Sequence, residues 1–154
     1  MKRTFLLAAG IFSCLFLNAQ SSADFVRSWE KGPDWLKDGV IYQVYPSSYK
    51  DSDGNGIGDI RGVISKLDYI ESLGVRAIWF NPLFVSGWID GGYDVIDFYR
   101  VDPRFGTNND LVELIEKAHA RGIKVMLDLV AGHTSDKHPW FLQSAQDSNL
   151  QYSD

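Results

Sequence analysis

The sequence predicts an α/β fold with a parallel sheet, because three strand-like segments alternate with two amphipathic helical segments. The segments Val40–Tyr45, Val75–Phe80 and Ile123–Val130 are rich in β-branched and aromatic residues, as buried strands are. The connections are long enough for crossovers that contain helices, so the strands run parallel. A doubly wound sheet and a (β/α) barrel both fit this order. No Gly-x-Gly-x-x-Gly motif follows the first strand, so a dinucleotide-binding sheet has no specific support.

Apolar periodicity predicts the two helices. Over Ile60–Leu73, apolar residues recur at steps of three and four, and Gly74 stands where a helix-ending glycine belongs. Thr107–Asp110 matches a capping box that precedes the apolar face of the second helix, and Gly122 follows that helix. A further short helix is expected at His138–Leu142.

The N-terminus predicts an export signal. Lys2 and Arg3 precede the apolar run Thr4–Leu17, which has the length of a signal-peptide core and is short for a membrane span. A small residue at Ala19 places cleavage near it, so residues 1–19 form the predicted signal peptide and residues 20–34 a polar lead-in. A buried hydrophobic helix is the alternative interpretation.

The composition excludes some functions. The net charge of −5, without a basic run beyond the N-terminus, argues against a nucleic-acid surface. The only cysteine, Cys14, lies inside the apolar run and gives little support for a lipid anchor, because further apolar residues follow it. We therefore expect a periplasmic or secreted protein that has no disulfide and no membrane contact beyond the signal peptide.

Polar side chains follow each predicted strand, which is where a barrel of parallel strands builds its site. Three segments have this pattern: Asp51–Asp59, Asp90–Asp94 and Asp128–Thr134. The second lies in the long loop 81–107, and a loop of that length in a compact domain is usually functional or partly structured.

The segment Asp51–Asp59 predicts a site for a hard divalent cation. Its oxygens alternate as in the first part of a calcium loop, and the candidate ligands are Asp51, Asp53, Asn55, the carbonyl of Ile57 and Asp59. Position twelve is Gly62 rather than a bidentate glutamate, so the segment is not an EF-hand. A solvated turn rich in Asp and Asn is the alternative.

The other two segments carry groups that suit a sugar. Asp90 can accept hydrogen bonds from neighbouring hydroxyls, and the ring of Tyr93 can pack on the apolar face of a pyranose. Asp128 and His133 follow the third strand, where both would point toward the same site. A glycine turn with a core tyrosine and a structurally held loop histidine explain the pattern equally well.

Five ordered motifs together resemble the N-terminal part of the alpha-amylase family, glycoside hydrolase family 13. They are Asp38–Pro46, Asp51–Gly62, Gly92–Asp94, Asp102–Thr107 and Asp128–Thr134. The resemblance covers about residues 35–154 and is greatest to the oligo-1,6-glucosidase, alpha-glucosidase and trehalose synthase branch.

The resemblance implies that residues 35–154 are the N-terminal portion, about three βα units, of a TIM-type (β/α)8 catalytic barrel. It implies a retaining enzyme that acts on α-glucosidic bonds, with an α-glucan or malto-oligosaccharide as its partner. It assigns a structural Ca²⁺ to the loop 51–59. It also assigns the pocket for the non-reducing glucose to Asp90, Tyr93 and His133, with Asp128 orienting the polar groups around them.

Some features of the family are absent from this sequence. The motifs that carry the family's nucleophilic Asp, acid Glu and third Asp do not occur, although a retaining glycosidase needs two carboxylates about 5 Å apart. Nothing supports Asp94, Asp97 or Asp102 in those roles. Gly132 replaces an Asn that binds a second calcium in some amylases, so the resemblance gives no support to a second calcium site. We expect the N-terminal part of a retaining enzyme, inactive as this chain alone.

Three alternatives stay open at the level of sequence. The whole protein could be a trehalose synthase-type transglycosylase rather than a hydrolase. The chain could also be a non-catalytic remnant that binds sugar through Asp90, Tyr93 and His133, or a calcium-dependent structural module. These alternatives differ in how the protein responds to sugar and to metal.

Overall fold

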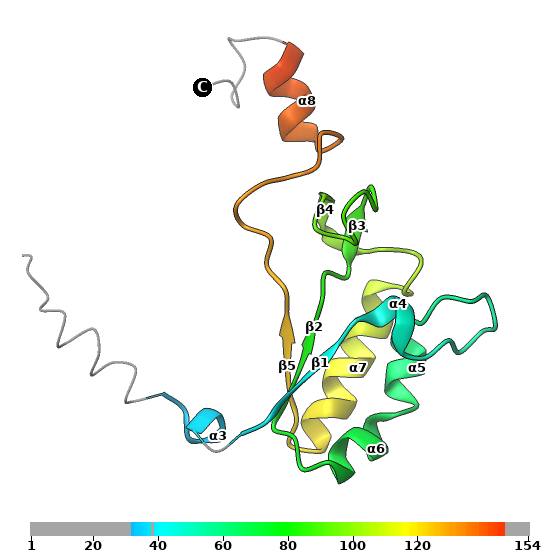
Figure 1. Ribbon diagram of the computed structural model, residues 1–154, viewed down its shortest axis with the longest axis vertical. Coiled ribbons are helices and arrows are strands. Elements are labelled where there is room, and N and C mark those ends of the chain that lie inside the picture. Colours follow the sequence, from blue (N-terminus) through cyan, green and yellow to red (C-terminus); the bar gives the residue numbers. More distant parts are fainter. Residues whose placement is uncertain (1–31, 38, 147–154) are drawn as a thin grey trace, which may run out of the picture. The chain divides into compact units, whose positions relative to one another are not determined.

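The central feature of the computed structural model, which describes residues 32–37 and 39–146, is a parallel sheet with the strand order β1-β2-β5 (Figure 1). It is formed by β1 (Ile41–Val44), β2 (Ala77–Phe80) and β5 (Lys124–Leu127). Ala77 lies opposite Ile41 on one side and Lys124 on the other. The three predicted strands and their parallel direction are confirmed, with the third strand ending at Leu127 rather than Val130.

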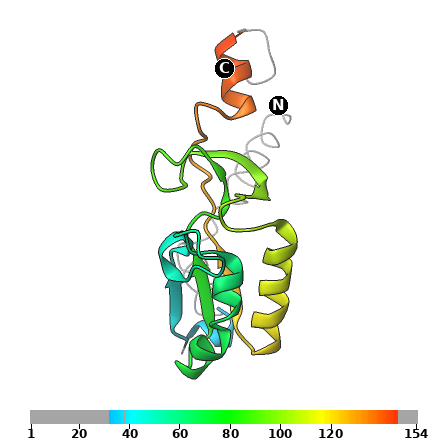
Figure 2. The ribbon, with the colours of Figure 1, turned by 90° about the vertical axis from the view of Figure 1, so that its right-hand side faces the viewer.

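The core lies between this sheet and three helices on one of its faces. Figures 1 and 2 show α5 (Ile60–Ile64), α6 (Leu67–Ser72) and α7 (Asn108–Ala120) on the same side of the sheet. The side chains that are fully buried between the layers come from β1, β2 and the three helices: Val44, Ile60, Val63, Leu67, Ile70, Ile78, Phe80 and Leu114. Burying apolar surface of this kind is the main stabilising contribution to such a layer pair.

The predicted helix Ile60–Leu73 is wrong as one continuous helix, because the chain forms two helices there. The hydroxyl of Ser65 donates to the carbonyl of Gly62 at 2.6 Å, and such side-chain bonds compete with the helical ladder. Lys66 then leaves the helical region, with φ −111° and ψ 5°. The apolar periodicity survives the break, since both pieces bury the same face. Gly74 ends the second piece with φ +71°, as predicted.

The long loop 81–107 is partly structured, as its length predicts. It contains the antiparallel pair β3 (Phe84–Ser86) and β4 (Val95–Val101). The sequence pattern gave no signal for this pair, nor for α4 (Pro46–Tyr49), which begins at a proline directly after β1. The predicted helix 138–142 is present as α8 (Pro139–Gln146) and is longer than expected.

The chain divides into two units, with bounds Met1–Lys37 and Asp38–Asp154. The short helix α3 (Asp34–Lys37) belongs to the first. The predicted signal peptide, residues 1–19 with Cys14, lies outside the described residues, as does the lead-in up to residue 31. Of the helices that are described, none combines the length and the apolar character needed to cross a bilayer.

The predicted capping box at the start of α7 is confirmed. The hydroxyl oxygen of Thr107 accepts from the backbone N–H of Asp110 at 3.2 Å, and the Asp110 carboxylate accepts from the Thr107 N–H at 2.8 Å. Arg61 of α5 also contacts this carboxylate at 2.6 Å. The hydrogen bond from the Thr107 side chain is the main reason why the pKa of Asp110 lies below its usual range. The buried Asp110 therefore caps the N-terminus of α7 and also links α7 to α5 through Arg61.

Replacing Thr107 with alanine should lower the free energy of unfolding by about 1 kcal/mol, because one N-terminal N–H of α7 loses its acceptor. Thr107→Ser keeps the hydroxyl and should restore most of that loss. Denaturant unfolding of the three proteins at neutral pH measures the difference. An equal loss in the serine and alanine variants would contradict the capping role.

The cost of Thr107→Ala should also depend on pH. The folded-state pKa of Asp110 is lowered, so its stabilising contribution is fully present above the unfolded-state value of about 3.9. That contribution is lost as the pH falls through the folded-state pKa. The difference between wild type and Thr107→Ala should therefore shrink in acid, and a difference independent of pH would show that the carboxylate takes no part.

Candidate functional site

A chain of hydrogen-bonded side chains runs across the carboxyl ends of the three parallel strands. Gln43 of β1 donates to Asn81, which follows β2, at 3.0 Å. Asn81 donates to the hydroxyl of Tyr93 at 3.3 Å. Tyr93 in turn donates to the carboxylate of Asp128, directly after β5, at 2.7 Å. Because parallel strands end at one edge of the sheet, residues 85 positions apart along the sequence meet in a single network.

The hydrogen bond to Asp128 keeps the Tyr93 phenol protonated and holds its ring in place. The pKa of the Tyr93 phenol lies above its ordinary value, mainly because the phenol donates to the Asp128 carboxylate and secondly because it is partly buried. The phenol is therefore neutral at physiological pH and remains a donor. Its ring is tethered through the oxygen to loops that follow two different strands, which restricts its rotation.

Asp90 lies close to this network on a tight glycine turn. One oxygen of its carboxylate accepts from the backbone N–H of Asp94 at 2.8 Å, and its negative charge contributes to the raised pKa of Tyr93. Gly91 and Gly92 have φ values of +75° and +109°, which L-residues rarely adopt. The turn is thus specified by the glycines, and it places Asp90 near Tyr93, which is bonded to Asp128; their role in binding sugar stays a prediction.

His133 has a different environment. It is exposed and lines a hollow of about 420 Å³ together with Phe98, Leu129 and Trp140. Within residues 39–146, the hydrogen bonds of the Tyr93 network do not include His133. Its assignment to the sugar pocket stays a prediction.

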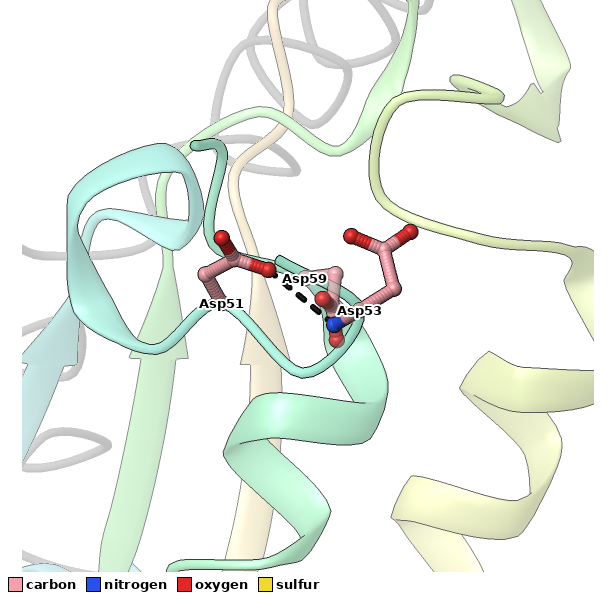
Figure 3. Close-up of side chains that lie close together, drawn as sticks. All are labelled: Asp51, Asp53 and Asp59. Carbon is pink, nitrogen blue, oxygen red and sulfur yellow. Dashed lines mark hydrogen bonds between the residues drawn. The ribbon is translucent and has the colours of Figure 1, made fainter. Parts of the chain in front are cut away.

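The second candidate site is the loop between α4 and α5. Ligand oxygens of Asp51, Asp53 and Asp59 lie within 4.8 Å of one another, and Figure 3 shows the three side chains side by side above the start of α5. Gly54 and Gly56 have φ values of +85° and +91° and allow the chain to curl around these oxygens. The separation and the purely oxygen donor set fit a hard divalent cation.

Backbone N–H groups hold the carboxylates of this loop in place. Asp51 accepts from Gly54 and Gly56 at 2.7 and 2.8 Å, and from Asp53 at 3.0 Å. The bond from Gly56, then that from Gly54, lowers the pKa of Asp51, so this carboxylate is ionised at neutral pH. A carboxylate has about four lone-pair positions, so these bonds leave room for a metal.

The remaining predicted ligands lie on the same loop. Asn55 donates to Asp53 at 3.0 Å, and its own oxygen accepts from the N–H of Ile57 at 2.8 Å. Asp59 is buried and caps α5 by accepting from Gly62 at 2.6 Å. The carbonyl of Ile57 as a ligand stays a prediction.

A cation of the protein itself also lies next to the loop. Arg61 lines a hollow of about 170 Å³ together with Asp53, Asn55 and Asp59. Its guanidinium is engaged by Asp110 at 2.6 Å and by Glu113 at 3.9 Å. This pairing directs its charge toward α7, which leaves the loop oxygens without a lysine or arginine ion pair among the described residues.

Two members of the network were missed at the level of sequence: Gln43 and Asn81. A signal for each was present. Gln43 is the one polar residue inside an otherwise apolar and aromatic strand, and Asn81 is the first residue after another strand. A polar side chain at the carboxyl end of a parallel strand is placed to reach the site.

Comparison with known proteins identifies the family to which this chain is related. Residues 43–154 match the family model for the alpha amylase catalytic domain. The chain is 48% identical over 121 residues to an oligo-1,6-glucosidase of Heyndrickxia coagulans, which covers 79% of this chain and 22% of that protein.

Two solved structures show the same similarity in three dimensions. The trehalose-6-phosphate hydrolase of Bacillus licheniformis has a TM-score of 0.76 at 49% identity, over 78% of this chain and 22% of that one. The isomaltulose synthase of Klebsiella sp. LX3 has a TM-score of 0.76 at 47% identity, over 79% and 22%.

The chain thus spans about a fifth of the length of the relatives that it matches. The sheet β1-β2-β5 with its helices corresponds to part of the TIM barrel of these enzymes, and no closed barrel is present among the described residues. The expected fold and the expected relationship are both confirmed: the chain belongs to the alpha-amylase family, as a portion of its catalytic domain.

Proposed function

We propose that the chain is the N-terminal part of an exported enzyme that acts on α-glucosidic bonds of oligosaccharides. The observation that carries this proposal is the 2.7 Å hydrogen bond from Tyr93 to Asp128. It joins the loops after β2 and β5 at the sheet edge where such barrels build their sites. The relatives named as an oligo-1,6-glucosidase and a trehalose-6-phosphate hydrolase support α-glucosides as the substrate class.

In this proposal, Asp90 and Tyr93 hold the non-reducing glucose unit. The Tyr93 ring is tethered through its oxygen and offers an apolar face to a pyranose. Asp90 uses one oxygen for the N–H of Asp94, and the other can accept from sugar hydroxyls. His133 would add a hydroxyl contact, supported by its place in the motif 128–134. Asp128 orients Tyr93 rather than reacting with the substrate.

In this proposal, the groups that cleave the glycosidic bond do not come from this chain. Retaining glycosidases use two carboxylates about 5 Å apart, one as nucleophile and one as acid. We assign both to residues outside this sequence. The residues described here would bind and orient the sugar, which lowers the entropic cost of reaching the transition state.

Transglycosylation or isomerisation is the second candidate reaction. A synthase that makes isomaltulose is 47% identical to this chain, about as similar as the hydrolases. The described portion is therefore compatible with either outcome, and we place the choice between water and a sugar as acceptor in other parts of the protein.

Asp90→Asn should lower kcat/KM for an aryl α-glucoside by about 10- to 100-fold, because the transition state loses a hydrogen bond to a charged acceptor. The reading frame should first be followed past the Asp154 codon and the full-length protein expressed. Asp136→Asn is the matched control, since Asp136 is an exposed carboxylate outside the proposed pocket. Absence of turnover in the wild-type protein, with maltose still shifting its tryptophan fluorescence, would instead support a sugar-binding remnant.

We also propose that Ca²⁺ binds the loop 51–59 and stabilises the fold. The proposed ligands are Asp51, Asp53, Asn55, the Ile57 carbonyl and Asp59. Support comes from the closeness of the three carboxylates and from the lowered pKa of Asp51, since a ligand must be deprotonated. The role is structural, because the loop lies between two helices and one of its ligands, Asp59, is also the cap of α5.

Calcium should raise the melting temperature of the wild-type protein, and Asp53→Ala should abolish that rise. At a hundredfold excess over the dissociation constant, mass action contributes about 2.7 kcal/mol to stability. Glu116→Ala, a change at an exposed acidic residue of α7, is the matched control and should keep the full calcium response. A melting temperature indifferent to calcium in the wild type would refute the proposed site.

Export rests on the N-terminal sequence, in which a basic start precedes the run 4–17. Expression in a bacterial host should give a mature protein whose N-terminal sequence begins near Gln20. Cell fractionation should place it in the periplasm or medium, and Leu6→Arg within the apolar run should keep it inside the cell with Met1 or Lys2 first. An uncleaved wild-type protein in the cytosol would argue against export.

A further inference from the structure

The carboxylate of Asp94 is buried but only half satisfied. Asp94 is 8% exposed, and its Oδ1 accepts from the backbone N–H of Ile89 at 3.2 Å. Its Oδ2 is inaccessible to solvent and makes no hydrogen bond to any described residue. A buried carboxylate oxygen without a partner carries a large desolvation cost. A donor, and preferably a cation, therefore belongs beside this atom.

Oδ2 of Asp94 packs against Gly87, and the ammonium group of Lys137 lies close to the same glycine. A Cβ atom built on Gly87 would overlap Oδ2 of Asp94 and would lie 3.8 Å from Nζ of Lys137. The oxygen and the ammonium therefore both lie beside Gly87, and the oxygen can pack there because residue 87 has no side chain. The φ of Gly87 is not in the left-handed region, so the glycine is needed here for space rather than for backbone conformation.

Lys137 is available for this contact. It is exposed, and it takes part in no ion pair within residues 32–37 and 39–146. Its backbone is fixed, since the Lys137 N–H donates to the hydroxyl of the buried Ser135 at 3.2 Å. A lysine side chain has four rotatable bonds, so its ammonium can approach Oδ2 of Asp94 beside Gly87 without a change in the backbone.

We propose that the ammonium of Lys137 closes on Oδ2 of Asp94 beside Gly87 and forms an ion pair with it, which locks the loop after β5 onto the loop after β2. Lys137 is then a positioning residue. The lock matters for catalysis only if the proposed function is correct, because it acts on the groups assigned to the sugar.

The lock acts on the proposed site through contacts already formed. The backbone N–H of Asp94 holds the carboxylate of Asp90 at 2.8 Å, so fixing Asp94 fixes the orientation of Asp90. On the other side, the N–H of Ser135 donates to the carbonyl of Val95 at 2.9 Å. That bond ties the loop 128–138 to the start of β4, and the ion pair would add a second tie two residues further along.

A double-mutant cycle on the full-length protein tests the ion pair without reference to sugar. Lys137→Met should lower the melting temperature by about 4 °C in the wild-type background and have almost no effect in the Asp94→Asn background. Lys124→Met, at an exposed lysine of β5, is the matched control and should behave alike in both. Equal shifts for Lys137→Met in the two backgrounds would overturn the proposal.

A measurement on the unmutated protein guards against poor folding of the Asp94 variant. In protein labelled with ¹⁵N-lysine, the ammonium protons of Lys137 should exchange with water more slowly than those of Lys124, because a buried carboxylate accepts from them. Exchange at the same rate in both lysines would also overturn the proposal.

Enzyme kinetics separates this inference from the proposed function. Lys137→Met should raise KM and lower kcat/KM for an aryl α-glucoside severalfold, and Lys137→Arg should restore much of the loss. Coupling in the stability cycle without α-glucosidase activity would leave the ion pair standing and remove the proposed function. Enzyme activity without coupling between Lys137 and Asp94 would support the proposed function and remove the ion pair.

Discussion

Parallel pairing of three strands is the constraint on which the rest of the structure depends. β2 lies between β1 and β5, and its side chains are almost entirely buried. Because all three strands run in one direction, the residues that follow them emerge at one edge. The hydrogen-bonded network from Gln43 through Asn81 and Tyr93 to Asp128 owes its assembly to this arrangement.

The two candidate sites are built on different physical principles. The loop 51–59 is local: its carboxylates are held by N–H groups within a few residues, and glycines with positive φ make the turn possible. The network around Tyr93 is non-local, since one member lies in β1, two lie in the loop 81–107 and one follows β5. The site in the loop 51–59 requires only that this loop adopts its turn, whereas the Tyr93 network requires that the whole sheet has formed.

The sheet also shows how this portion relates to the larger enzymes. Ile41 of β1 and Met126 of β5, the strands at the two edges, each remain 37% exposed. Exposed edges and apolar side chains of this kind are covered in a closed barrel by further strands and helices. The similarity to chains in which this segment makes up 22% of the length agrees with that geometry.

The sequence by itself determined the features that depend on short-range chemistry. Alternating apolar segments specified the three strands, Thr107 and Asp110 specified the start of α7, and the spacing of Asp51 to Asp59 specified the compact loop. Tertiary structure decided what no local pattern encodes. It formed β3 and β4 inside the long loop, and it joined Gln43 and Asn81 to Tyr93 in one network. The physical reason is that a side chain's partner across a sheet is set by strand order and register, which the residues next to it in sequence do not contain.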